Sequence, residues 1–383
     1  MTRAFRILVV LAPLALPRPA AAQIAVSAND GKAALVNGAT TVAATPSPDT
    51  VTVLDLSVWP PRPAGEVRAP SSVVGPPQSV AIAPDRSFAI VTAALKLDPA
   101  DAGKTVPDDR VSVIDLRASP VAIIGTLHAG RQPSGVSINA AGTLALVANR
   151  ADGTVSVLTI AGKTVSPAGT VDLGAPDSAP SHVVFTPDGK RALVTRNTDS
   201  LISVLTIDGT RVTYGKQDIA AGLKPYGIDV TPDGHFAIVA NIGAGAGGGA
   251  DTLSVIDLAA TPPRAVNHVS VGPTPEGIAL SADGRYVAVT VMNGTNAAPA
   301  SPLYHDRGLL KILRLEGASL RPVTEAPIGR WCQGVAWHPD GRGLLVQCMI
   351  EREIRTFRFD GSRLTSGPAI AVAAGPAGIR VRH

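Results

Sequence analysis

The sequence is poor in aromatic residues, in charged residues and in cysteine. Phe, Trp and Tyr make up 3% of the 383 residues, charged residues make up 17%, and there are two cysteines. The net charge of +4 is small, and no basic stripe alternates with aromatic side chains, which argues against nucleic-acid binding. The histidines are dispersed, and no Cys-x-x-Cys-His or Gly-x-Ser-x-Gly motif occurs. We therefore expect no metal, no haem or other cofactor, and no serine-hydrolase chemistry.

The first residues have the pattern of a secretory signal. Arg3 precedes an apolar run over residues 7–16, and the alanines at 20–22 form a small-residue cleavage site. We predict that residues 1–22 are removed and that residues 23–383 form the mature protein, periplasmic or secreted from a bacterium. After this segment no stretch reaches ~20 consecutive apolar residues, so we expect no transmembrane segment in the mature chain.

One phrase recurs seven times, at intervals of about fifty residues. It consists of Gly-x-x-Pro-x-Gly-Val, an Asp-Gly turn, a valine-rich run and a run similar to Ser-Val-Ile-Asp-Leu. Each Asp-Gly turn has the residues of a type I turn followed by a left-handed glycine, which joins two antiparallel strands. The turn residues that align the copies are Asp30, Asp85, Ala141 (a degenerate copy), Asp188, Asp233, Asp283 and Asp340.

A repeat of this length with several short strands predicts an all-β, seven-bladed β-propeller with four antiparallel strands in each blade. All copies then form one closed domain. Residues 375–381 repeat the first-strand phrase without a following turn, and the N-terminus opens at the Asp30 turn with only a short strand, 24–28, before it. We expect the two ends to share one blade, which closes the ring. The sequence leaves open which end supplies the innermost strand.

The residues just after the repeated proline are mostly polar. In propellers this position faces the axis at one channel mouth, where the long connections 96–110, 243–251 and 293–308 should form a crown of loops. We expect a hydrogen-bonding funnel suited to a small anionic or carbonyl-rich ligand, and the alternative is a water-filled channel. The candidate ligand-binding residues are Gln78, Ser134, Arg150, Ser181, Tyr226 and Gln333, together with Glu276, the one carboxylate of the ring.

Blade four departs from the repeat at two positions. His182 stands where other blades have glycine or serine, and Arg196 stands where blades three and five have asparagine. Strand alternation predicts that both side chains leave the same face as diagonal neighbours. An imidazole can transfer a proton, and a guanidinium can bind a carboxylate or an oxyanion. The alternative is that His182 fills space between blades and Arg196 lies on the rim.

The two cysteines are each eight residues from Asp340, one before it and one after. The hairpin rule therefore places Cys332 and Cys348 opposite each other, and in an oxidising compartment we expect a disulfide between them. Two buried free thiols are the alternative.

Segments such as 144–149, 236–241 and 252–258 resemble the YVTN-repeat family of seven-bladed propellers. The same superfamily contains lactonase-like propellers similar to 6-phosphogluconolactonase and to the fungal carboxymuconate-cyclising enzymes. The stretch 180–189 looks like the His-bearing repeat of that group. The resemblance implies chemistry without a metal that uses His, Arg and Glu at the channel mouth, and His182 is the residue that matches by motif.

Three functions follow from these observations. The first is an exported propeller that binds a small molecule or a periplasmic protein at the channel mouth without catalysis. The second is a metal-independent lactonase with His182, Arg196 and Glu276 as catalytic residues. The third is a scaffold subunit of a periplasmic dehydrogenase complex. Fold alone does not choose among them, because propellers host all three.

Overall fold

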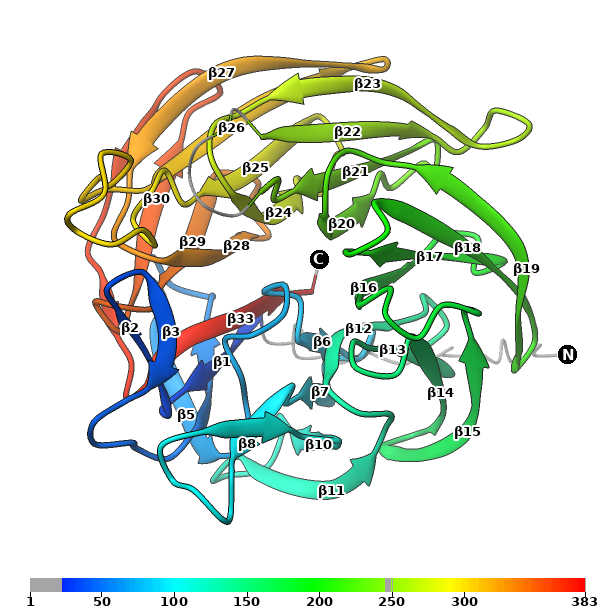
Figure 1. Ribbon diagram of the computed structural model, residues 1–383, viewed down its shortest axis with the longest axis horizontal. Helices are drawn as coiled ribbons and strands as arrows, with labels where there is room; N and C mark the ends of the chain where they lie inside the picture. The colour runs from blue at the N-terminus through cyan, green and yellow to red at the C-terminus, as the bar shows by residue number, and fades with distance from the viewer. Residues whose placement is uncertain (1–22, 245–248, 250, 383) are drawn as a thin grey trace, which may run out of the picture.

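The computed structural model describes residues 23–244, 249 and 251–382. The predicted signal, 1–22, lies outside the described residues. Seven four-stranded antiparallel sheets stand around a central channel, as the fold prediction requires (Figure 1). Within the described ranges, no helix has the length and apolar character needed to cross a membrane.

Each blade runs from an innermost strand at the channel to an outermost strand at the rim. From inside to outside, blade one contains β33 (Gly375–Val381), β1 (Ile24–Asp30), β4 (Thr50–Asp55) and β5 (Arg62–Arg68), and blade two contains β6 (Val80–Ile82), β7 (Phe88–Thr92), β10 (Arg110–Asp115) and β11 (Ala122–His128). Blade three contains β12 (Pro133–Ile138), β13 (Leu144–Asn149), β14 (Thr154–Ala161) and β15 (Thr164–Asp172). Blade four contains β16 (Pro180–Phe185), β17 (Arg191–Arg196), β18 (Leu201–Asp208) and β19 (Arg211–Ala220).

The other three blades follow the same order. They are β20 (Pro225–Val230), β21 (Phe236–Asn241), β22 (Thr252–Asp257), β23 (Arg264–Ser270); β24 (Pro275–Leu280), β25 (Tyr286–Val291), β26 (Leu309–Glu316), β27 (Ser319–Pro327); and β28 (Cys332–Trp337), β29 (Gly343–Cys348), β30 (Glu353–Phe359), β31 (Leu364–Ser366), with β32 (Ile370–Ala371) also on β30. Two short hairpins, β2 (Ala33–Val36) with β3 (Ala39–Val42) and β8 (Leu95–Leu97) with β9 (Thr105–Pro107), rise above one face.

The exposure of the strands follows their place in the blade. The second strands are buried almost throughout, because a neighbouring blade covers each of their faces. The outermost strands alternate; β23 has every second side chain in water. Small aliphatic side chains form the interblade cores, for example Leu146 and Val155 against Val183 and Val194. This packing explains how a chain with few aromatic residues buries enough apolar surface to fold.

The prediction that both ends share one blade is confirmed. The C-terminal strand β33 is innermost and the N-terminal strand β1 lies second, with Ser27 opposite Ile379. Gln347 of the preceding blade donates from Nε2 to Ser27 Oγ at 2.7 Å and to the Gly378 carbonyl at 3.0 Å. These buried bonds fasten the closing blade to its neighbour.

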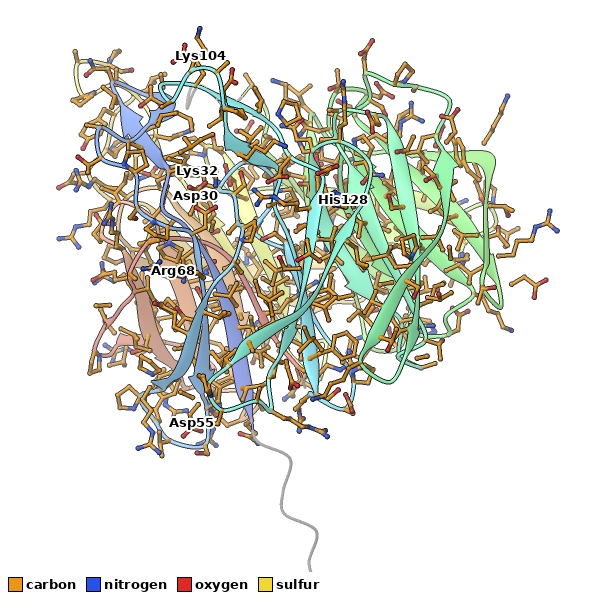
Figure 2. All side chains as sticks on the ribbon, turned by 90° about the horizontal axis from the view of Figure 1, so that it is seen from below. Asp30, Lys32, Asp55, Arg68, Lys104 and His128 are labelled. Atoms are coloured by element: carbon orange, nitrogen blue, oxygen red, sulfur yellow. A yellow bond between two sulfur atoms is a disulfide. The ribbon has the colours of Figure 1, made fainter. Side chains whose placement is uncertain are left out.

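Asp30 is not the turn residue that the repeat alignment predicts. It ends β1, a second strand, and its carboxylate accepts hydrogen bonds from the amides of Lys32, Ala33 and Val73. Figure 2 shows Asp30 toward the face that carries Lys104, away from Asp55. The repeat alignment placed Asp30 wrongly because it is followed by glycine, as in the turns. The residue of this blade that is equivalent to the asparagines ending other second strands is Asn29.

The asparagine near the end of the second strand makes the same hydrogen bonds in three blades. Asn29 donates from Nδ2 to the hydroxyls of Thr50 and Thr52, each at 3.0 Å. Asn149 does the same with Thr154 and Ser156, and Asn241 with Thr252 and Ser254. The amide therefore ties the end of a second strand to the start of the third, which keeps the blade in register.

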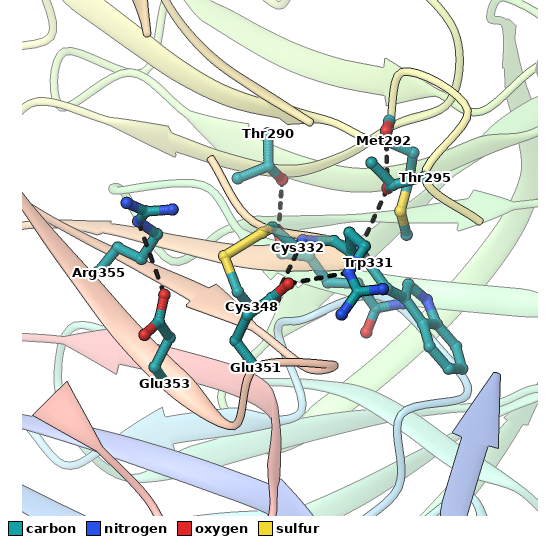
Figure 3. Close-up of a disulfide and its surroundings, with 11 residues drawn as sticks. Thr290, Met292, Thr295, Trp331, Cys332, Cys348, Glu351, Glu353 and Arg355 are labelled. Atoms are coloured by element: carbon teal, nitrogen blue, oxygen red, sulfur yellow. Dashed lines mark hydrogen bonds and ion pairs between the residues drawn. A yellow bond between two sulfur atoms is a disulfide. The ribbon is translucent and has the colours of Figure 1, made fainter. Parts of the chain in front are cut away.

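The predicted disulfide is present. Cys332 and Cys348 lie opposite each other on β28 and β29 with their Cα atoms 3.9 Å apart, and both are buried (Figure 3). Nearer the turn the ladder pairs Val335 with Val346, which is one residue away from the register centred on Asp340, and an extra residue between Cys332 and Val335 restores the predicted pairing at the cysteines.

Candidate functional site

Four inner strands bring polar side chains together on the channel axis at the face with the long loops, which we call the loop side. Arg150 donates to Ser181 Oγ, and its guanidinium lies 5.6 Å from the centre of the Tyr226 ring. Glu276 is hydrogen-bonded to Gln333. We call the group Arg150, Ser181, Tyr226, Glu276 and Gln333 the axial chamber. All but Arg150 come from the ring of positions predicted to face the axis.

The chamber is almost closed to water. Glu276 and Tyr226 are each 7% exposed, and Gln333 is 3% exposed. Burial raises the pKa of the Glu276 carboxyl to about 8, against the hydrogen bond from Gln333 and the charge of Arg150. Burial also raises the pKa of the Tyr226 hydroxyl, and the carboxylate of Glu276 adds to this. At neutral pH the site therefore favours a protonated carboxyl that can donate a hydrogen bond.

Several polar atoms at the chamber lack a partner. Within the described part of the chain, no protein group satisfies Glu276 Oε2, Gln333 Oε1, Gln78 Oε1 or Ser134 Oγ. A buried polar atom without a hydrogen bond costs about 1–3 kcal/mol, so several at one place call for an explanation other than packing.

A linker covers the chamber on the loop side. Residues 69–79 join β5 to β6 without regular structure, and Figure 1 shows them bending in toward the middle of the ring. We call them the cap linker. The Gly75 amide donates to the Tyr226 hydroxyl, and Val73 packs in a buried cluster with Met292, Trp331 and Met349. The sequence pattern does not predict this linker, and part of the expected crown of loops, 245–248 and 250, lies outside the described residues.

His182 lies between blades and is fully buried. Its Nδ1 accepts from the Ile228 amide of the next blade at 3.4 Å, and no protein group among the described residues satisfies its Nε2. Burial, with the charge of Arg380 second, holds the pKa of the imidazole well below its usual range, so the ring is neutral. A methyl group on Gly135 would overlap His182, which explains the glycine at the equivalent position.

Arg196 points to the outer part of blade four. It forms ion pairs with Asp199 and with Asp218, the latter at 3.4 Å, and is 6% exposed. The β16–β17 ladder pairs Pro180 with Arg196 and then Val183 with Val194, so β16 carries one extra residue. This bulge breaks the alternation on which a common face for His182 and Arg196 depended.

The three predicted catalytic residues therefore have separate surroundings. In the described part of the chain, His182, Arg196 and Glu276 share no hydrogen-bond or ion-pair partner. Glu276 is the one that the structure places with other predicted site residues. No group of three or more His, Cys, Asp or Glu in the described ranges is arranged to hold a metal ion.

A second cavity opens at the other end of the channel, on the face with the Asp-Gly turns, which we call the turn side. Its volume is about 430 Å³. Every inner strand contributes the residue three places after its chamber-level position. These residues are Ala81, Ser137, Val184, Asp229, Ala279, Ala336 and Arg380. Sequence reasoning missed this ring, although the same repeat alignment picks out Asp229 and Arg380 as its charged members.

The comparisons with known proteins agree with this architecture. A family model described as "Lactonase, 7-bladed beta-propeller" matches residues 161–301, a range that contains His182, Arg196, Tyr226 and Glu276. The chain is similar to the lactonase seven-bladed propellers. This confirms the predicted resemblance to the lactonase-like group, whereas the YVTN-repeat resemblance stays a prediction. A search of curated proteins finds no match.

Solved structures match over nearly the whole chain. A periplasmic gluconolactonase of Pseudomonas aeruginosa is 17% identical with a TM-score of 0.69, covering 94% of this chain and 99% of its own. A proposed 6-phosphogluconolactonase of Bacteroides fragilis is 16% identical with a TM-score of 0.71, covering 95% and 99%. A hydrazine synthase structure from Kuenenia stuttgartiensis is 17% identical with a TM-score of 0.62, covering 82% and 91%. At these identities the likeness shows the fold alone.

Proposed function

We propose that the chain binds a small molecule with carboxylate or carbonyl oxygens in the axial chamber. The observation that carries this proposal is the group of buried polar atoms there that have no protein partner. Small-molecule sites contain a few convergent polar groups shielded from water, and the chamber side chains are buried and polar. Binding of a ligand would satisfy atoms that the folded chain leaves unsatisfied.

The chamber offers both kinds of hydrogen-bonding group. The Arg150 guanidinium supplies a positive charge, and protonated Glu276 and the amides of Gln78 and Gln333 supply neutral donors and acceptors. This set suits a sugar acid or its lactone, which carries hydroxyls beside one carboxyl carbon. The cap linker is held by individual contacts and not by a strand ladder, so it is the segment that would move to admit a ligand.

Isothermal titration calorimetry with gluconate and with glucono-δ-lactone tests the proposal. We expect binding by the wild-type protein and an affinity at least about tenfold weaker for Arg150→Ala, because a hydrogen bond to a charged group is worth about 1.5–3 kcal/mol. Arg131→Ala is the matched control, since Arg131 is an exposed arginine paired with Asp152. Equal affinity in the two variants, or no heat with either ligand, would contradict the proposal.

Hydrolysis of a lactone in the same chamber is the second candidate. The observation that favours it is the carboxyl of Glu276, whose pKa of about 8 lets it exchange a proton near neutral pH beside a guanidinium. Water would add to the lactone carbonyl, the ring C–O bond would break, and the proton would pass to the departing ring oxygen. Arg150 would stabilise the oxyanion. His182 could also transfer a proton in this reaction, because its ring is neutral and its Nε2 has no hydrogen-bond partner among the described residues. The ion pairs of Arg196 favour a structural role for that residue.

A pH-stat assay of glucono-δ-lactone hydrolysis, corrected for the spontaneous rate, tests the second candidate. Loss of the enzymatic rate in Glu276→Gln, with the calorimetric affinity retained, would support it. If the wild-type protein hydrolyses the lactone no faster than buffer alone, the hydrolase function is excluded and the binding proposal is unaffected. His182→Ala tests the family-derived role of the imidazole in the same assay.

We also propose that the protein is exported from the cytoplasm. The disulfide between Cys332 and Cys348 supports a periplasmic or secreted location, because such bonds persist in oxidising compartments. Cell fractionation with an antibody to the chain tests it, and recovery in the cytoplasm with free thiols would count against it. The role as a scaffold subunit of a dehydrogenase complex stays a prediction.

A further inference from the structure

The turn-side cavity carries two arginines without an ion-pair partner among the described residues. Arg380 and Arg382 both line it. Among the described residues neither guanidinium is in a hydrogen bond or an ion pair. The two like charges lie close enough to act on each other: burial lowers the pKa of Arg382, and the charges of Arg86 and Arg380 lower it further. Such a cluster in a partly enclosed space attracts an anion.

The third charged residue of the cavity, Asp229, is held by the backbone and leaves the cavity with an excess of one positive charge. Asp229 accepts from the Val230 amide at 3.1 Å through Oδ1 and from the Leu280 amide at 3.1 Å through Oδ2. Its carboxylate is thus held by two backbone donors, one in its own blade and one in the next. Within the described ranges it forms no ion pair with Arg380. The guanidiniums remain available to a ligand.

The rest of the wall is mostly apolar. Val184, Phe185, Leu280 and Trp337 line the cavity, and the indole of Trp337 already donates to the Ala279 carbonyl at 3.1 Å. Two hydroxyl groups, on Ser137 and Thr186, interrupt this surface. A ligand that fills the cavity therefore needs an anionic head group for the arginines and an apolar body for the rest of the wall.

We propose that the turn-side cavity is a second binding site, separate from the axial chamber, for a small organic anion with an apolar body, such as an aromatic carboxylate. A charge-assisted, bidentate contact from Arg380 would hold the head group. The volume of about 430 Å³ lies within the range of small-molecule sites. Nothing in this inference depends on the function proposed for the chamber.

Calorimetric titration of the full mature chain at low ionic strength tests the proposal with three probes: benzoate, inorganic phosphate and uncharged benzyl alcohol. We expect benzoate to bind more tightly than either of the others, because only benzoate has both the charge and the apolar body. Arg380→Gln should weaken benzoate binding at least about tenfold. Raising the salt concentration should weaken it further, since the attraction is partly screened.

Two control variants distinguish this site from others. Arg342→Gln removes an exposed arginine next to an Asp-Gly turn on the same face, outside the cavity, and should leave benzoate affinity unchanged. Glu276→Gln alters the chamber and should also leave it unchanged. Equal loss in Arg342→Gln and Arg380→Gln, loss in Glu276→Gln alone, or tighter binding of phosphate than of benzoate would each overturn the proposal.

Discussion

The carboxyl of Glu276 should make the stability of the protein depend on pH in a defined direction. Burial raises its pKa in the folded protein from the ordinary value of 4.5 to about 8. Between these values the folded chain holds a proton that the unfolded chain has released. Stability is therefore greatest below pH 4.5 as far as this group is concerned, falls as the pH rises, and stops falling above about 8.

The size of the effect follows from the separation of the two pKa values. From 4.5 to about 8 is about 3.5 pH units. At 1.36 kcal/mol per unit, ionising Glu276 inside the fold costs about 5 kcal/mol across the whole window. Between pH 5.5 and 7.5 the loss should be about 3 kcal/mol, which is a large part of the stability of an ordinary domain.

Urea denaturation of the wild type and of Glu276→Gln at several pH values isolates this contribution. The variant keeps the shape of the side chain and cannot ionise, so the difference in free energy of unfolding between the two proteins should grow with pH in favour of the variant. Glu325→Gln is the control, because Glu325 is an exposed carboxylate on the outermost strand β27. Parallel pH profiles for wild type and Glu276→Gln would refute the reasoning, and a difference of the opposite sign would show that the folded protein stabilises the ionised form.

Two further predictions concern other buried groups. Replacing Cys332 and Cys348 together by serine should lower the free energy of unfolding by about 3 kcal/mol, the value expected for closing a loop of this length, with a fall in Tm of about 4 °C by calorimetry for a domain of this size; an unchanged Tm under non-reducing conditions would contradict it. His182 should act in the direction opposite to Glu276: its folded pKa lies well below 6.5, so stability should be lost as the pH falls below 6.5 and the unfolded imidazole takes up a proton. His182→Gln should abolish that acid-side loss in the same urea titrations, and a loss that persists unchanged would rule out the buried neutral ring as its source.

Features that rest on short-range rules could be predicted from the sequence. Counting residues from the Asp340 turn identified the Cys332–Cys348 pair, although a one-residue bulge between Cys332 and Val335 is what brings the two cysteines opposite each other. The tail copy over 375–381 implied a shared blade, since an unpaired first strand needs a second strand from elsewhere in the chain. The first inference concerns one hairpin, whereas the second joins the two ends of the chain and followed from the repeat pattern.

Other features depended on a local irregularity that alternation does not reveal. A bulge in β16 places one extra residue between Pro180 and Val183, and it turns His182 toward the next blade instead of toward Arg196. The Asp-Gly pair at Asp30 looked like a hairpin turn but ends a second strand, where its carboxylate binds the cap linker. In both cases the residue type fitted the repeat pattern, but the residue occupies a different position in the blade from the one that the pattern predicts.

The sequence by itself determined that the chain forms a closed ring of seven similar sheets, because turn residues and apolar alternation act within a few residues and recur in every copy. Only the tertiary structure decided which end of the channel is covered and which is open. The cap linker reaches the axis through contacts with Tyr226 and Trp331, and the turn-side cavity needs one residue from every blade. Such sites join residues that are far apart along the chain, and no local pattern specifies where they meet.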